Sequence, residues 1–371
     1  MTDNQTIYST DLAGIVVGET AISDVQGQTG TLSYRGIDIG DLAGKPFTEV
    51  VYLVLFGHWP DAAQNCELAS FLAHNSALDS PEVALLKNCS RNLHPMLMLQ
   101  GLLPLITLPE TNSGPWGTPA EHGLILAAKI PALIAGHYRL GLGQELIPAS
   151  ADYTAHENFL HMFHGKAAST AQIDILDAAQ ILQIEHSFNA GTFAGRVCAS
   201  TQAPIQSAIS ASIGTLFGKL HGGADQAALE MAMGVGSADK AEAFVADALA
   251  NKQKIMGMGH REYRTVDPRA LILKPMAMDF CQSDDSRALL ATLVAIEEAC
   301  QHHFAAQGKE IWANVDFYKG AVFHTLGIPS NYFTAMFAMA RVFGYIAHYL
   351  EFSNDSRLIR PRALYKAAAA A

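Results

Sequence analysis

Apolar residues recur every three or four positions along most of the chain, the spacing that places side chains on one face of a helix. The segment 284–304 shows this well, because five apolar residues share one face: Leu289, Leu293, Ile296, Cys300 and Phe304. Asp284 or Asp285 is expected to cap its first turn, where a carboxylate can accept hydrogen bonds from free backbone N–H groups. The pattern therefore predicts a mostly helical protein.

A second long helix is predicted over residues 330–352, begun by Ser330 or Asn331. Its apolar positions form one broad stripe: Phe333, Phe337, Ala340, Phe343, Ala347 and Leu350. Arg341 interrupts the apolar run four residues after Phe337, and so lies on the same face. A buried arginine requires an anionic partner, which could be a protein group or a ligand.

The N-terminal segment has a different pattern. Residues 13–39 alternate weakly between apolar and polar side chains, and Gly27, Gly30 and Gly36 supply turn positions. One or two short β-hairpins are expected here, so the predicted fold class is mostly α with small N-terminal β-hairpin elements. Glycine-rich polar passages near 221–223 and 326–331 are the expected hinges between two lobes.

The composition fits a compact enzyme or a subunit with a large buried interface. The chain has 371 residues, half of them hydrophobic, which is enough for a substantial core in one or two domains. A net charge of -11 argues against a general nucleic-acid binder. Charged residues and proline interrupt the longest apolar runs, so no membrane span is predicted.

The cysteines indicate the compartment. The chain has five of them, widely spaced and without a CxxC pair, so neither a disulfide framework nor a zinc site is indicated. No secretory signal is visible at the N-terminus. We therefore expect a cytoplasmic protein without a metal site.

In this acidic chain, four bases crowd into the stretch KIMGMGHREYRTVDPR at residues 254–269: Lys254, Arg261, Arg264 and Arg269. GMG resembles the start of a dinucleotide-binding fingerprint, but Glu262 occupies the position of the third glycine, so that fold is rejected. Gly257 and Gly259 still permit a tight loop that approaches a flat ligand closely, and the bases around it suit phosphate groups. A solvent-exposed basic turn is the alternative from these residues alone.

Three other segments hold side chains suited to acid–base chemistry: IEHSFNAGTFAGR with His186, GKLHGGADQ with His221 and NVDFYKG with Asp316. His260 lies in the basic stretch itself, where the Asp-Pro pair at 267–268 marks a turn or helix start that sets Arg269 beyond the loop. Each has a plainer explanation, because most of the 15 histidines will be surface or satisfied core residues and an aspartate can cap a helix. Together they suit acid–base work on a polyanion, without indicating a substrate.

Taken in order, these segments resemble the citrate synthase family. The family pattern contains EH and NA close together, then LHGGAN, GxGHxxYxxxDPR, NVDFY, a helical arginine and RP. This chain has EHSFNAGT, LHGGAD, GMGHREYRTVDPR, NVDFY, Arg341 and IRPRA in the same order. LSYRGIDIGDLA near the N-terminus and HPM at 94–96 also match, so the resemblance extends over residues 12–365.

The resemblance implies a two-domain, almost all-α fold with the active site in the cleft. Residues 1–222 and 328–371 would form a large helical domain, and residues 223–327 a small one that carries the basic loop. It also implies an obligate homodimer of the short type, acting on the small molecules acetyl-CoA and oxaloacetate. Coenzyme A would enter as a thioester substrate, and no tightly bound cofactor, nucleic acid or membrane partner is expected.

Residue roles follow from the same resemblance. Asp316 matches the base that takes a proton from the acetyl-CoA methyl group, His221 the neutral histidine that stabilises the enol, and His260 the acid that protonates the oxaloacetate carbonyl. The oxaloacetate ligands, with Arg360 acting in the other subunit's site, would be His186, Arg269, Arg341, Arg360 and Phe337. The residues expected to bind coenzyme A are Lys254, Gly257, Gly259, Arg261 and Arg264.

Three positions depart from the family pattern: Gln100, Asp225 and Glu262. Asp225 replaces the usual Asn and adds a negative charge four residues after His221. Glu262 lies beside the coenzyme A loop, and Gln100 stands where many short members have Arg. None of the three removes a catalytic residue.

The predicted activity is the condensation of acetyl-CoA with oxaloacetate and hydrolysis to citrate and coenzyme A. One alternative is 2-methylcitrate synthase, which uses propionyl-CoA, because one methylene discriminates by only about 1–3 kcal/mol in an apolar pocket. An alternative from another class is a coenzyme A-binding relic that has lost catalysis. The joint presence of His221, His260 and Asp316 argues against a relic.

Overall fold

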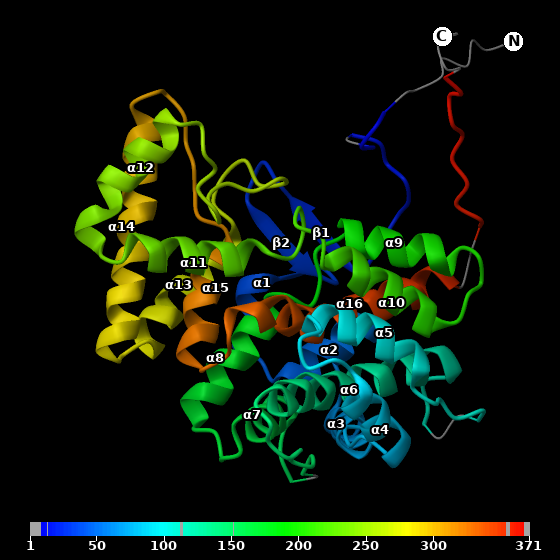
Figure 1. Cartoon of the computed structure of the whole chain (residues 1–371). Helices are drawn as coiled ribbons and strands as arrows, with labels where there is room; N and C mark the ends of the chain where they lie inside the picture. Colours follow the sequence, from blue (N-terminus) through cyan, green and yellow to red (C-terminus); the bar gives the residue numbers. More distant parts are fainter. Residues whose placement is uncertain (1–8, 13, 112–113, 151, 354–356, 367–371) are drawn as a thin grey trace, which may run out of the picture.

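The computed structural model describes residues 9–12, 14–111, 114–150, 152–353 and 357–366, most of them helical (Figure 1). The helices of the first half are α1 (Ile39–Leu42), α2 (Phe47–Phe56), α3 (Ala62–His74), α4 (Ser80–Asn88), α5 (Pro95–Leu102), α6 (Thr118–Gly141), α7 (Ala155–His164) and α8 (Thr170–Ile181). Those of the second half are α9 (Ala190–Ala199), α10 (Ile205–Leu216), α11 (Ala224–Val235), α12 (Ala241–Ala250), α13 (Pro268–Phe280), α14 (Asp284–Ala305), α15 (Val315–Thr325) and α16 (Phe333–Ser353). Short 3-10 helices lie at η1 (Leu103–Leu105), η2 (Ala238–Lys240) and η3 (Ser330–Tyr332).

The strands form one small antiparallel sheet near the N-terminus, which confirms the predicted hairpin region. Its order is β1 (Ser23–Gln26), β2 (Thr31–Tyr34) and β3 (Ile37–Asp38). In the register of the sheet, Tyr34 pairs with Ser23 on one side and with Ile37 on the other. Tyr34 is fully buried, so one face of this sheet joins the helical core. The mostly α fold with a small β element is therefore confirmed.

Helix α16 forms the centre of the core, and it is more buried than predicted. Every residue from 333 to 348 is buried, not only the expected stripe. The helix packs against α2, α6, α9 and α10, which surround it, and a helix enclosed in this way has no polar face. It follows directly on the 3-10 helix η3, so the expectation that Ser330 or Asn331 begins it was wrong. Among the described helices, none has the length and apolar character needed to cross a membrane.

Helix α14 confirms the predicted face but corrects its cap. Leu289, Leu293, Ile296 and Cys300 are buried, and Phe304 is half-buried. The N-cap is Ser283, whose hydroxyl oxygen accepts a hydrogen bond from the Ser286 backbone N–H at 3.3 Å. The two aspartates occupy the first turn instead, where their charge is favourable at the positive end of the helix dipole.

Helices α11 to α15 gather on one side of the molecule (Figure 1). Helices α11, α13 and α14 pack on α15, and α12 packs on α14. This group meets the rest of the fold where α13 contacts α8 and α11 contacts α16. The first turn of α15, which carries Asp316, therefore lies close to this junction.

Candidate active site

The basic loop is fixed to the segment that precedes α15. Gly257 and Gly259 both have a φ of +79°, a backbone conformation that favours glycine. The Gly259 N–H donates to the Trp312 carbonyl at 2.7 Å, and the Asn314 N–H donates to the Gly257 carbonyl at 2.9 Å. A Cβ at Gly257 would lie only 2.6 Å from Cδ2 of Phe317. The loop therefore approaches α15 closely, and glycine makes the approach possible.

The N-terminal hairpin supports the same loop from its other side. The Arg264 N–H donates to the Gly27 carbonyl at 2.8 Å, and a Cβ at Gly27 would lie 2.2 Å from the Glu262 carbonyl oxygen. The sequence predicts only a turn at Gly27, because its contact with the loop depends on the folded chain. Lys254 and Arg264 are exposed on this loop. Arg261 is also exposed, with its guanidinium 3.8 Å from the Asp11 carboxylate.

His260 lies in the loop beside the buried Arg269. Its Nδ1 accepts the backbone N–H of Glu262 at 3.0 Å, so the proton of the neutral ring is on Nε2. Nε2 lies 3.4 Å from Nη2 of Arg269. Burial and then the charge of Arg269 lower the pKa of His260 to about 4. The ring is therefore neutral at pH 7.

Asp267 explains why Arg269 is held so firmly. As predicted, it begins a helix: it is the N-cap of α13, with proline at N1. Its carboxylate accepts from Nε and Nη2 of Arg269 at 3.0 and 2.9 Å. It also accepts the Val315 backbone N–H at 3.1 Å. This one buried carboxylate thus ties the start of α13 to the start of α15.

His186 faces the same region from the segment between α8 and α9. Its Nε2 lies 3.1 Å from the Tyr263 hydroxyl, and its ring centroid is 5.4 Å from that of His260. Burial, and next the charge of Arg269, hold the pKa of His186 well below its ordinary value. The preceding Glu185 anchors this segment, because its carboxylate lies 2.8 Å from Nε2 of His348.

His221 lies in the turn before α11. Its Nε2 is 3.1 Å from Oδ1 of Asn189, the N-cap residue of α9. That oxygen also accepts the Thr192 N–H, so it is the amide oxygen that faces the ring and Nε2 of His221 that donates. Burial and then the charge of Arg341 lower the pKa of His221 to about 4. Asn189 stands in the EHSFNAGT segment, but nothing in the sequence alone indicates a role for it.

Asp316 is not a helix cap, which removes the plainer explanation of this residue. Asn314 is the N-cap of α15 and accepts the Asp316 N–H at 3.0 Å. The Asp316 side chain lies in the first turn and is 21% exposed. Burial opposes its ionisation, but Lys319, and then Arg269 and His260, lower the pKa of Asp316 below its ordinary value. Asp316 is therefore ionised beside two neutral histidines.

Lys319 is a further residue of this site that the sequence analysis did not identify. Its Nζ lies 2.6 Å from Oδ1 of Asp316, and its side chain is almost fully buried. The available signal was a lysine three residues after an aspartate in an otherwise apolar helix, since residues at this spacing are neighbours.

Arg341 and Phe337 form the wall of the site on α16. Nε of Arg341 donates to the Gln183 carbonyl at 2.6 Å, and the guanidinium lies 4.7 Å from the Phe337 ring centroid. Arg341 is 1% exposed, yet no carboxylate of the described residues lies within 4.0 Å of it. Arg341 is near enough to Glu185 to lower its pKa, but no described carboxylate forms an ion pair with Arg341, so this buried cation suits an anionic ligand.

Two of the singled-out residues are not at this site. Arg360 is exposed on the segment 357–366, which runs away from the helical body (Figure 1). Gln100 lies on α5, where its backbone carbonyl accepts from the Ser210 hydroxyl at 2.8 Å. Glu262 is exposed on the basic loop.

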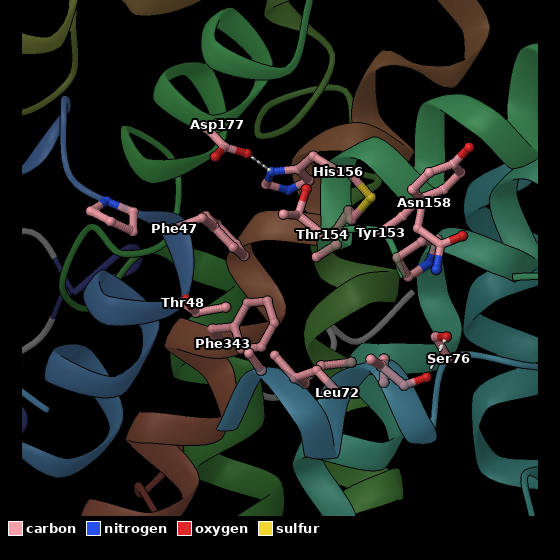
Figure 2. A pocket seen from close by; sticks show the side chains of 18 of the residues that line it. Phe47, Thr48, Leu72, Ser76, Tyr153, Thr154, His156, Asn158, Asp177 and Phe343 are labelled. Atoms are coloured by element: carbon pink, nitrogen blue, oxygen red, sulfur yellow. Dashed lines mark hydrogen bonds and ion pairs between the residues drawn. The ribbon is translucent and has the colours of Figure 1, made fainter. Parts of the chain in front are cut away.

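A separate cavity of about 190 Å³ lies behind α16 (Figure 2). Its lining includes Phe343 and Met339, which are two positions away from Arg341 and therefore point to another side of the helix. His156 and Asp177 stand at one end, with Nδ1 and Oδ1 2.5 Å apart. None of the residues expected to bind a substrate lines this cavity. In the described ranges, no three His, Cys, Asp or Glu side chains are grouped to hold a metal ion.

Comparison with known proteins decides the family. The family described as "Citrate synthase, C-terminal domain" matches residues 11–362. The chain belongs to the citrate synthase family. Citrate synthase 2 of Bacillus subtilis is 35% identical over 358 residues, which covers 95% of this chain and 94% of that protein. The 2-methylcitrate synthase of Shewanella oneidensis is 35% identical over 372 residues, with 98% and 96% covered.

Solved structures give the same result. Citrate synthase from Thermotoga maritima has a TM-score of 0.87 and 34% identity, covering 98% of this chain and 97% of that one. A citrate synthase from Thermoplasma acidophilum, solved as a ternary complex with carboxymethyl coenzyme A and oxaloacetate, has a TM-score of 0.88 at 28% identity, with 96% of each chain covered. The predicted family, fold class and transferase activity are confirmed: the chain is an enzyme of the citrate synthase type.

Proposed function

We propose that this chain joins acetyl-CoA to oxaloacetate with Asp316 as base and His221 and His260 as the two acid–base histidines. One observation supports this most strongly: an ionised carboxylate lies among neutral imidazoles, near a buried arginine, Arg341, that forms no ion pair with any carboxylate in the described part of the chain. The thioester methyl group is too weakly acidic for a carboxylate to form a free enolate. The base must act while a donor holds the developing charge on the thioester oxygen.

His221 is the proposed donor to the thioester oxygen. It is neutral, so its N–H can stabilise the enol without contributing a full positive charge. In the structure this N–H donates to Asn189. Binding the thioester would require that it leave Asn189 when the substrate enters, and Asn189 would orient the ring until then.

His260 is the proposed acid for the oxaloacetate carbonyl. The backbone of Glu262 occupies its Nδ1, which leaves the Nε2 proton for the substrate. Arg269 lies 3.4 Å from that nitrogen, so a carboxylate of oxaloacetate bound by Arg269 would lie next to the donor. Arg341, His186 and Phe337 would complete the oxaloacetate site within the chain, since guanidinium groups bind carboxylates by paired hydrogen bonds.

The basic loop is the proposed coenzyme A site. Gly257 and Gly259 shape its backbone, and Lys254, Arg261 and Arg264 would contact the phosphates. The three bases are exposed, as required for a ligand that binds from solvent. Coenzyme A would act as a thioester substrate, and the proposal needs no tightly bound cofactor.

We further propose a homodimer in which Arg360 completes the partner's site. Arg360 is exposed on the segment 357–366, which runs away from the helical body and has apolar side chains that are also exposed. Leu358 is 61% exposed, Leu364 78% and Tyr365 88%, and exposed apolar groups in one segment suit burial against another chain. The division into residues 1–222 with 328–371 and residues 223–327 belongs to the same proposal, as does a cytoplasmic location.

The acyl group is the part of the proposal with a direct rival. Relatives with both activities are equally similar at 35% identity, so similarity does not choose between acetyl-CoA and propionyl-CoA. Initial rates of thiol release with oxaloacetate and each acyl-CoA, with the products identified by mass spectrometry, make the choice. We expect kcat/KM to favour acetyl-CoA by about tenfold or more, the range that one methylene allows. A higher value for propionyl-CoA would make the protein a 2-methylcitrate synthase.

A further inference from the structure

A buried lysine lies behind the proposed base. Lys319 is on α15, three residues after Asp316, and its Nζ lies 2.6 Å from Oδ1 of Asp316. Nζ also lies 3.2 Å from Oδ2 of Asp225 and donates to Oε1 of Gln183 at 2.9 Å. Nζ therefore donates two hydrogen bonds, to Asp316 and Gln183, while Asp225 is an ion-pair partner whose Oδ2 accepts no hydrogen bond.

Asp225 supplies the second carboxylate from a different helix. It lies in the first turn of α11, is completely buried, and accepts the Gln226 N–H at 2.8 Å. At this position in LHGGAD the family usually has Asn, which would be neutral. The acidic residue therefore gives Lys319 a buried counter-charge that Asn could not provide.

Lys319 also connects the base to the proposed oxaloacetate wall. Its Nζ is 4.4 Å from the centroid of the Phe337 ring, and Arg341 contacts that ring as well. Gln183 links the two cations, because its side-chain oxygen accepts from Lys319 and its carbonyl oxygen from Arg341. A movement of Lys319 would thus change the positions of both Asp316 and Arg341.

The two carboxylates are not equivalent. Burial raises the pKa of Asp225, although Lys319 opposes the shift, whereas Lys319, Arg269 and His260 together lower the pKa of Asp316 against the effect of burial. The groups that act on Asp316 thus come from its own helix, from α11, from α13 and from the basic loop, and His221 lies close enough for Asp316 to affect its pKa. Asp316 is therefore the more acidic of the two carboxyl groups.

We propose that Lys319 is a positioning residue for the base, and that Asp225 limits how strongly it holds the base; this rests on the proposed role of Asp316. The hydrogen bond from Lys319 fixes Oδ1 of Asp316. No hydrogen bond from another described residue engages Oδ2, which leaves this oxygen to take the proton. An ammonium held by Asp316 alone would weaken the base. Asp225 divides the charge of Lys319 between two carboxylates.

Three variants test this proposal: Lys319→Met, Asp225→Asn and the double variant. Lys319→Met should lower kcat about 10²-fold, the usual effect of misplacing a reacting group, with a smaller change in KM. The acid limb of its profile of kcat against pH should move to higher pH. The reason is that Asp316 loses its nearest cation while the charge of Asp225 remains, and both effects raise the pKa of Asp316. Asp225→Asn should move the acid limb to lower pH and lower kcat several-fold.

The double variant gives the sharpest result. It replaces a buried ion pair with neutral groups of similar size, so it should exceed the kcat of Lys319→Met by about tenfold, while its acid limb stays above that of the wild type. Circular dichroism shows whether Lys319→Met folds. If it does not, comparing the acid limb of the double variant with that of the wild type still tests the predicted shift. Lys129→Met is the matched control, since Lys129 forms a buried ion pair with Glu82 at 2.7 Å on α6. It should lose stability without a change in the pH profile.

The outcomes are distinct. A wild-type kcat and pH profile in Lys319→Met would overturn the proposal while the proposed function stands. If Lys319→Met lost kcat but its acid limb stayed where it is in the wild type and in Lys129→Met, Lys319 would only stabilise the fold, and this result would overturn the proposal too. A wild-type protein that releases thiol from neither acyl-CoA would overturn the proposed function, and this proposal with it.

Discussion

Burial decides the protonation of the histidines at the site. His221 and His260 each have a pKa of about 4, because burial and a neighbouring arginine disfavour the imidazolium form. In an unfolded chain an imidazole has a pKa of about 6.5. Between these values the unfolded chain binds protons that the folded chain does not, so the free energy of unfolding should fall as pH falls from 6.5 towards 4.

This sign can be tested by urea denaturation at pH 7 and pH 5. Replacing His260 with Gln removes one histidine whose pKa the fold lowers. The free energy of unfolding of His260→Gln should therefore fall less from pH 7 to pH 5 than that of the wild type. His74→Gln, at an exposed position on α3, controls for the substitution itself. Equal losses in wild type and His260→Gln would show that His260 is not held neutral by the fold.

At this scale the sequence revealed the residues in short motifs but not their partners. Asp316, His221 and His260 stand in segments that a reader can recognise. Lys319 does not, because its buried state depends on Asp225 and Gln183, which reach it from other elements. Asn189 and Asp267 were visible too, but only the folded chain shows which side chains they hold.

At the scale of elements, the basic loop is positioned from two sides. The N-terminal hairpin supports it through Gly27, and the segment before α15 pairs with it through Gly257 and Gly259. A single loop thus connects the expected coenzyme A contacts with the first turn of α15. Strain in this loop should therefore affect both the binding of coenzyme A and the position of Asp316.

Gly257 and Gly259 offer a matched pair to test this. Both have a φ of +79°, so alanine is strained at either position. A Cβ at Gly257 would also meet Phe317 at 2.6 Å, whereas the nearest atoms at Gly259 lie 3.9 Å away. Gly257→Ala should therefore be less stable than Gly259→Ala by about 1–3 kcal/mol in urea denaturation, and should raise KM for acetyl-CoA more. Equal effects would mean that the close approach to α15 does not position the loop.

Elements were easier to predict than their ends. The long periodic segments at 284–304 and 330–352 are helices, and the hairpin lies within 13–39. The caps were wrong because several polar residues adjoin each start, and hydrogen-bond geometry chooses Ser283 over its neighbours. The burial of α16 on every side depends on the helices around it, which a local pattern does not contain.

At the scale of the whole molecule, the proposed homodimer would complete each site with Arg360 of the other chain. Arg360 lies on the segment 357–366, which has exposed apolar side chains and runs away from the helical body (Figure 1). The proposed function therefore includes two chains for each active site. Mixing two variants that fail for different reasons tests the base and the shared site together.

The variants are Asp316→Asn and Arg360→Ala. Each alone should lose about 10²-fold or more in kcat. Asp316→Asn lacks the base, and Arg360→Ala lacks the arginine that would bind a carboxylate of oxaloacetate in the partner's site. After subunit exchange, each heterodimer would carry both lesions in one site and neither in the other. An equal mixture should then recover about a quarter of the wild-type activity, because half of the randomly formed dimers hold one intact site.

The measurement is the rate of thiol release from acetyl-CoA with oxaloacetate, before and after exchange that native mass spectrometry verifies. A rise from near zero to about a quarter of the wild-type rate is the predicted result for two-chain sites. An unchanged rate after complete exchange would contradict the shared site, and an Asp316→Asn protein within a few-fold of wild type would contradict the central role of Asp316.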